Sequence, residues 1–190
     1  MNSSNTPLNL LIGNGMKLSI SAAPKGICGS ERKFVQYTFS RVNVMHDVAN
    51  RAWLDGETNP AGLQEEALRS RQEFQDLLEN GNARLTEHYA SLVWDELTCE
   101  FGETASNEVT SEHFYLEGIV SGGLSDSILK QTCRLLYESL VSGILAGYAP
   151  RVRSDRSETF SAEYASWKSS LHRLLQRRKP GSVRLKTHPF

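Results

Sequence analysis

Hydrophobic side chains recur at every third or fourth position along residues 124–149, the longest segment with an uninterrupted helical pattern. The stripe consists of Leu129, Cys133, Leu136, Leu140 and Ile144. This spacing places apolar side chains on one face of an α-helix, and further apolar residues widen the stripe toward its end. We therefore predict a buried central helix that has Ser125 as its N-cap and ends at Gly147 and Pro150.

Small residues mark a second face of this predicted helix. Ser139, Gly143 and Gly147 repeat every four positions, and such a row lets another backbone approach closely. The row either packs inside the domain or forms the contact of a homodimer. A membrane span is not predicted, because the charge-free stretch covers only residues 140–149 and a bilayer requires about 20 apolar residues.

Helical spacing also occurs in four other segments, residues 31–54, 63–78, 83–101 and 157–175. The short connection between the second and third segments predicts an antiparallel helical hairpin. The first segment is rich in β-branched residues before Ser40, so a strand up to that residue is the alternative.

Two short apolar runs, residues 8–12 and 16–21, are separated by Gly13, Asn14 and Gly15, which is typical of a hairpin turn. Residues 113–120 alternate enough to form either a short strand or the end of a helix. The predicted fold class is all-α or predominantly α, with about five helices packed around residues 124–149 and at most a small N-terminal β-hairpin. The predicted organisation is a disordered arm (1–7), a single helical domain (8–180) and a basic C-terminal tail (181–190).

Composition fits one globular domain, since 39% of the 190 residues are hydrophobic and 23% are charged. The cysteines, Cys28, Cys99 and Cys133, are far apart and include no CxxC pair. A disulfide framework and a zinc ribbon are therefore not indicated, and a reducing cytoplasm is the predicted location.

Charge is distributed unevenly along the chain. Residues 1–54 hold 6 basic and 2 acidic side chains, residues 55–117 hold 3 basic and 15 acidic, and residues 118–190 hold 12 basic and 5 acidic. The acidic middle and the basic end can bind two kinds of partner, or they can face each other in the folded chain.

The basic end is the strongest candidate for a binding site, because no acidic residue follows Glu163. The candidate binding residues are Arg173, Arg177, Arg178, Lys179, Arg184 and Lys186. Such a face can follow a nucleic-acid backbone, contact a protein partner, or pair with the acidic zone of the chain itself.

Three groups of residues are candidate sites of chemistry. Glu100 and Glu103 form an ExxE that resembles the first half of the magnesium motif of all-α nucleotide pyrophosphatases, but the second half, ExxD, is missing. His46 and Asp47 resemble the paired ligands of helical metal-dependent phosphohydrolases, but no histidine precedes them; the alternative is a partly buried His beside an exposed Asp. His88, Asp95 and Cys99 share one side of a predicted helix, which ordinary packing also explains.

We therefore predict a small, non-catalytic cytoplasmic protein that binds another macromolecule, either a protein or nucleic acid, without metal or cofactor. The predicted contact surfaces are the basic C-terminal helix and tail and the acidic helical hairpin. A magnesium-dependent enzyme similar to the all-α nucleotide pyrophosphatases is the alternative.

Overall fold

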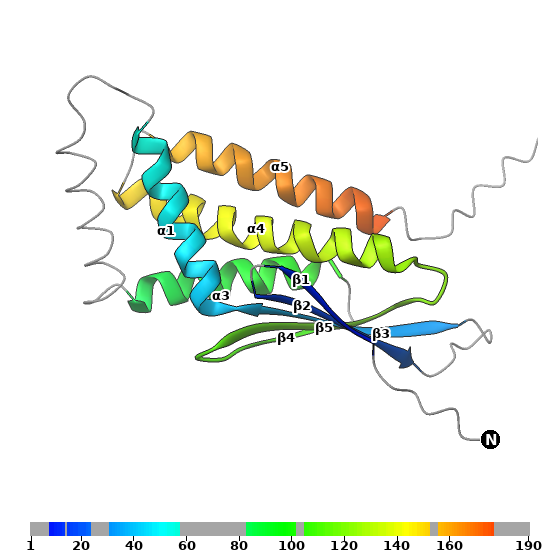
Figure 1. The fold of residues 1–190 in the computed structure, drawn as a ribbon. Helices are drawn as coiled ribbons and strands as arrows, with labels where there is room; N and C mark the ends of the chain where they lie inside the picture. The colour runs from blue at the N-terminus through cyan, green and yellow to red at the C-terminus, as the bar shows by residue number, and fades with distance from the viewer. Residues whose placement is uncertain are drawn as a thin grey trace, which may run out of the picture.

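A five-stranded antiparallel sheet forms one layer of the molecule in the computed structural model, which describes residues 8–13, 15–23, 31–57, 83–101, 105–152 and 156–176 (Figure 1). The strand order across the sheet is β1-β2-β3-β5-β4. The strands are β1 (Leu8–Gly13), β2 (Met16–Ala23), β3 (Arg32–Ser40), β4 (Ser106–Val109) and β5 (His113–Ser121).

Four helices are described, and all of them lie on the same side of this sheet (Figure 1). They are α1 (Arg41–Glu57), α3 (Ala83–Cys99), α4 (Asp126–Val152) and α5 (Ser157–Gln176). α3 and α4 lie next to the sheet and α5 packs on α4 from the outside. The described part of the chain contains no helix that is both long and apolar enough to cross a membrane.

The predicted all-α or predominantly α fold is wrong, because the described residues form a five-stranded sheet as well as helices. The first segment assigned to a helix, residues 31–54, is strand β3 followed by helix α1. Val35 and Phe39 are four positions apart, a spacing that fits one turn of a helix and also two repeats of a strand. Tyr37, between them, is buried on the same side, which only a strand allows.

Several local predictions are confirmed. The N-terminal hairpin is present as β1 and β2, and both glycines of its turn have positive φ, 110° for Gly13 and 70° for Gly15. The strand alternatives are correct for residues up to Ser40 and for residues 113–120. Of the predicted helical hairpin, α3 is present, whereas residues 63–78 lie outside the described residues, as do the predicted arm (1–7) and tail (181–190).

The predicted central helix is confirmed as α4. The Ser125 side chain accepts a hydrogen bond from the Ile128 backbone N–H (3.4 Å), as an N-cap does. Leu129, Leu136, Leu140 and Ile144 are fully buried. The predicted end was wrong, because α4 continues through Pro150 to Val152.

The row of small residues on α4 packs inside the domain. A Cβ atom on Gly143 would lie 2.6 Å from Val93 of α3 and 2.9 Å from Tyr164 of α5, and one on Gly147 would lie 2.7 Å from Tyr89. Ser139 is also fully buried. This face is therefore used by the neighbouring helices, and a homodimer would need another surface.

Aromatic side chains join the sheet to the helices. Trp94 of α3 meets Phe39 of β3 and Phe114 of β5 edge to face, with ring centroids 5.5 and 5.8 Å apart. Its indole N–H donates to the Tyr115 carbonyl (2.9 Å), so the buried polar group is satisfied. Tyr137 of α4 also meets Phe39 edge to face, with ring centroids 5.6 Å apart, and completes the cluster.

Candidate functional site

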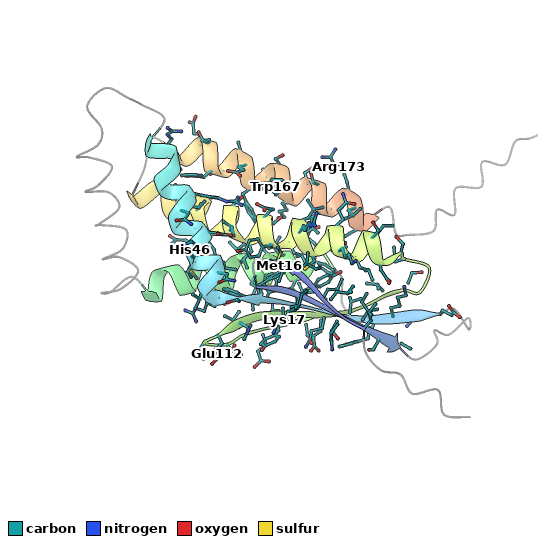
Figure 2. All side chains as sticks on the ribbon, viewed as in Figure 1. Met16, Lys17, His46, Glu112, Trp167 and Arg173 are labelled. Carbon is teal, nitrogen blue, oxygen red and sulfur yellow. The ribbon has the colours of Figure 1, made fainter. Side chains whose placement is uncertain are left out.

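Of the six predicted binding residues at the basic end, only Arg173 lies in the described part of the chain. It is exposed on the outer side of α5, near the end of that helix (Figure 2). Its guanidinium donates to the Ser169 carbonyl and to the Ser170 hydroxyl of the same helix, both at 3.3 Å. The other five predicted residues, Arg177, Arg178, Lys179, Arg184 and Lys186, lie outside the described residues.

Acidic residues in α3 and directly after its end face basic residues of α5, and we call this contact the α3–α5 seam. Glu96 accepts hydrogen bonds from Lys168 and from the Tyr164 hydroxyl (2.6 Å). Glu100 accepts one from Nδ1 of His172 (2.6 Å) and lies 3.9 Å from the Lys168 ammonium. At this seam the acidic middle and the basic end of the chain therefore pair with each other.

The seam keeps Glu96 ionised. The hydrogen bond from Lys168 lowers the pKa of Glu96 below its ordinary value of 4.5, the hydrogen bond from Tyr164 adds to this, and burial opposes it. Burial, followed by the hydrogen bond to Glu96, raises the pKa of Tyr164. Both groups are held in the protonation states they have at neutral pH, which suits an ion pair better than proton transfer.

The acidic ExxE does not present a free carboxylate pair in the described residues. Glu100 is engaged by His172 and Lys168, and Glu103 lies outside the described residues. No cluster of three or more potential metal ligands occurs among the residues that are described. The five-stranded sheet also differs from the all-α fold that the pyrophosphatase resemblance implied.

The other two candidate groups hold the fold together. Asp47 of α1 is the partly buried member of the His46–Asp47 pair and accepts a hydrogen bond from the Tyr137 hydroxyl (2.6 Å), whereas His46 is exposed. This is the reverse of the prediction. Asp95 accepts a hydrogen bond from the Asn107 side chain (2.9 Å), which ties α3 to β4.

One surface of the molecule carries no helix in the described structure, and this is the sheet face opposite α3 and α4, which we call the open face (Figure 1). Met16 and Lys17, neighbours on β2, point to opposite faces of the sheet. Met16 lies toward the helices and Lys17 points away from them (Figure 2). Strand pairing places further side chains beside Lys17 in one row across the open face: Leu11, Thr38, Tyr115 and Glu108.

A polar row lies next to this one and crosses all five strands. It contains Asn9, Ser19, Gln36, Glu117 and Ser106, and Gln36 donates a hydrogen bond to Glu117 (2.6 Å). Beyond it, Phe34 and Ile119 face each other on β3 and β5. The open face thus has a polar centre with apolar side chains on both sides of it.

Two of these apolar side chains are exposed, Leu11 much more than Ile119. Leu11 is 81% exposed and Ile119 is 38% exposed, while Phe34 and Tyr115 are half-buried. The charged groups of this face are of both signs, with Lys17 and Arg32 on one side and Glu108 and Glu117 on the other.

Sequence reasoning missed the open face, although a signal was present. Lys17, Ser19 and Ser21 alternate with the buried Leu18 and Ile20 of β2. Gln36 and Thr38 alternate with buried residues in the same way within β3, although the spacing of Val35 and Phe39 there also fits a helix.

Comparison of the chain with protein families, with curated proteins and with solved structures finds no match.

Proposed function

We propose that this protein is a non-catalytic binding protein that docks another protein on the open face of its sheet. The observation that carries this proposal is the one-sided cover of the sheet. The described helices lie on one side, and the other side exposes Leu11 and Ile119. Antiparallel sheets can leave one face in water, but that face is then usually polar throughout.

The arrangement of the open face suits a protein surface. Protein interfaces combine a few apolar or aromatic anchors with surrounding polar groups that fix the register. Phe34 with Ile119 on one side of the polar row and Tyr115 on the other offer two anchor points, and Glu117 between them offers a charged acceptor. Leu11 lies on β1, three strands away from Tyr115. The partner is expected to supply apolar side chains for both points and a hydrogen-bond donor between them.

Charge on the open face favours a protein over nucleic acid. A nucleic-acid backbone is bound by clustered Lys and Arg, and nearby carboxylates repel it. Lys17 and Arg32 are balanced on this face by Glu108 and Glu117. A partner protein can match charges of both signs, which a row of phosphates cannot.

The basic end supports nucleic-acid binding as a second candidate function. Arg173 is exposed, and Arg177, Arg178 and Lys179 follow it in the sequence. Lys168 and His172, however, are engaged with Glu96 and Glu100, so part of the positive charge of α5 is neutralised within the molecule. We therefore rank this function second.

We also infer that the protein works in the cytoplasm. Cys99 and Cys133 are free thiols, and Cys99 is exposed. An exposed free thiol is better tolerated in a reducing compartment than in an oxidising one.

The test replaces Ile119 with Asp and compares it with Leu92→Asp on α3. Leu92 is 50% exposed, so the control places the same charge on an exposed apolar position of the helical layer. Each purified variant, checked by circular dichroism, is used to capture proteins from cell extract, and a protein retained by the wild type is then purified. We expect Ile119→Asp to weaken its binding at least about tenfold, equivalent to about 1.4 kcal/mol, and Leu92→Asp to leave it unchanged.

Two results would contradict the proposal. Equal binding by wild type and Ile119→Asp would place the interface elsewhere. In a parallel titration near 50 mM salt, a fluorescent duplex and a single strand are offered to the protein. Binding that disappears when Arg173, Arg177, Arg178 and Lys179 are replaced together, with no protein partner captured, would put the nucleic-acid function first.

A further inference from the structure

The two edges of the sheet are protected very differently. β4, at one edge, is only four residues long and contains Glu108, and short or charged edge strands resist pairing with other chains. β1, at the other edge, has six residues, LNLLIG, with neither a charge nor a proline. Among the described residues β1 pairs only with β2, so its outer edge is open to another strand.

The hydrogen-bond pattern of the sheet determines which backbone groups of β1 face away from β2, toward the open edge. The Ser40 N–H donates to the Gly15 carbonyl (3.1 Å), which continues the β2–β3 register. Antiparallel pairs alternate, so Lys17 and Ser19 also direct their backbone groups to β3, and Leu18 and Ile20 direct theirs to β1. The partners of Leu18 and Ile20 are Leu10 and Leu8, which leaves the backbone groups of Asn9 and Leu11 facing outward.

The side chains of β1 continue the core toward this edge. Leu8 and Leu10 pair with Ile20 and Leu18, so they lie on the helix side, and Leu10 and Ile12 pack against the core. Leu8 is still 47% exposed, which shows that the described helices do not cover the outer side of β1 at this end. The register of β1 with β2 is regular from Leu8 to Leu11 and shifts only after Leu11.

We propose that β1 is a dimerisation edge, on which the β1 strand of a second copy of this chain pairs in antiparallel orientation. A two-fold axis at Leu10 would place the outward backbone groups of Asn9 opposite those of Leu11 in the second copy, where they exchange hydrogen bonds. On the helix side, Leu10 would meet Leu10, and Leu8 would lie beside Ile12.

A second copy fits this edge because the strand complements itself. LNLLIG contains no charge, so self-pairing brings no like charges together, and the helix-side leucines of one copy extend the apolar row of the other. The interface is small, and we expect weak association in the micromolar range. It uses the backbone edge of β1, and of the open-face side chains discussed above only Leu11 and Asn9 stand on that strand, so it does not depend on the proposed docking function.

The test is Asn9→Pro. Proline removes the outward N–H of Asn9 and leaves the β1–β2 hydrogen bonds of Leu8 and Leu10 in place, and proline is tolerated on edge strands. Leu11→Lys is a second variant, which places a charge on the same edge. Leu92→Lys is the control, because Leu92 is exposed on α3.

Sedimentation velocity of the full chain at several concentrations up to about 100 µM gives the result. We expect a concentration-dependent dimer for the wild type and for Leu92→Lys, and at least a tenfold larger dissociation constant for Asn9→Pro and Leu11→Lys. Circular dichroism confirms that each variant is folded. A monomeric wild type, or a dimer that resists both edge variants, would overturn the proposal, whereas Ile119→Asp should leave the dimer intact.

Discussion

Two serines on α4 carry buried hydroxyl groups. Ser139 and Ser142 are fully buried, and their Oγ atoms have no hydrogen-bond partner among the described residues. A buried polar group without a partner loses its hydration and gains nothing in return. Their small volume, which lets the neighbouring helices approach, explains their presence better than their polarity does.

Ser142→Ala should therefore stabilise the protein. Alanine keeps the small volume, removes the unpartnered hydroxyl and has a higher helix propensity, so we expect a gain of about 1 kcal/mol in the free energy of unfolding. The change is measured by urea denaturation followed by circular dichroism.

Thr98→Val is the matched contrast for this measurement. The Thr98 hydroxyl donates to the Trp94 carbonyl (2.7 Å) and accepts from the Asn107 side chain (2.8 Å). Its removal leaves Asn107 without this acceptor and should cost about 1–2 kcal/mol. If Ser142→Ala and Thr98→Val lost equal amounts of unfolding free energy, the Ser142 hydroxyl would have a hydrogen-bond partner after all.

At the scale of the elements, the α3–α5 seam makes stability depend on pH. The pKa of Glu96 is lowered in the folded protein, so its contribution to stability is fully present above the unfolded value and is lost as the pH falls through the lower folded value. Below an ordinary pKa of 4.5, the wild type should therefore lose this stabilisation progressively. Glu96 is 47% exposed, so water weakens the effect.

Glu96→Gln should flatten this part of the pH profile. The variant should be less stable than the wild type at neutral pH, and the difference should shrink between about pH 5 and pH 3 because glutamine does not titrate there. Glu108→Gln, at an exposed position on β4, is the control and should follow the wild type. Thermal melts across this pH range provide the comparison, and parallel profiles for the wild type and Glu96→Gln would rule out a role of the seam.

The sequence predicts helices of this protein better than its strands, for a physical reason. In α5, Phe160, Tyr164 and Leu171 are spaced by four and seven positions, and the odd spacing excludes a strand with one buried face. In β3, the spacing of Val35 and Phe39 fits both a helix and a strand, so pairing with the neighbouring strand β5 determines which of the two forms. β4, with the sequence SNEV, has no apolar pattern at all and is a strand because β5 pairs with it.

The candidate site was less predictable than the fold. The open face exists only once five strands from distant parts of the chain are in register, which no local pattern specifies. Leu11 also makes the exposed side of β1 hard to recognise, because LNLLIG is apolar on both sides and shows no clean alternation of apolar and polar residues. The charge asymmetry, in contrast, was visible in the sequence, and at the seam its two zones meet.

For the whole molecule, α4 is the element on which the other layers converge. The sheet packs on one side of it, α3 and α1 lie beside it, and α5 covers it from the outside. Arg51 of α1 pairs with Glu138 of α4 and lies 3.6 Å from Glu163 of α5, which links three helices. A disturbance at the centre of α4 should therefore affect every layer together.

Gly143→Leu tests this dependence. Any side chain at this position would meet Val93 at 2.6 Å and Tyr164 at 2.9 Å, and Tyr164 is held in place by its hydrogen bond to Glu96. Neither neighbour can move without disturbing α3 or α5. We therefore expect overpacking to reduce the free energy of unfolding by more than about 3 kcal/mol, and to lower the midpoint of the cooperative unfolding transition or abolish it. Gly118→Ala on β5 is the control, since its added Cβ would lie 3.9 Å from Ala105, an ordinary contact. Circular dichroism shows whether Gly143→Leu folds, and sedimentation shows its oligomeric state. Loss of folding is the outcome expected for small residues packed inside the domain. If the wild type is a dimer and Gly143→Leu is a folded monomer, the small residues of α4 contact a second subunit instead.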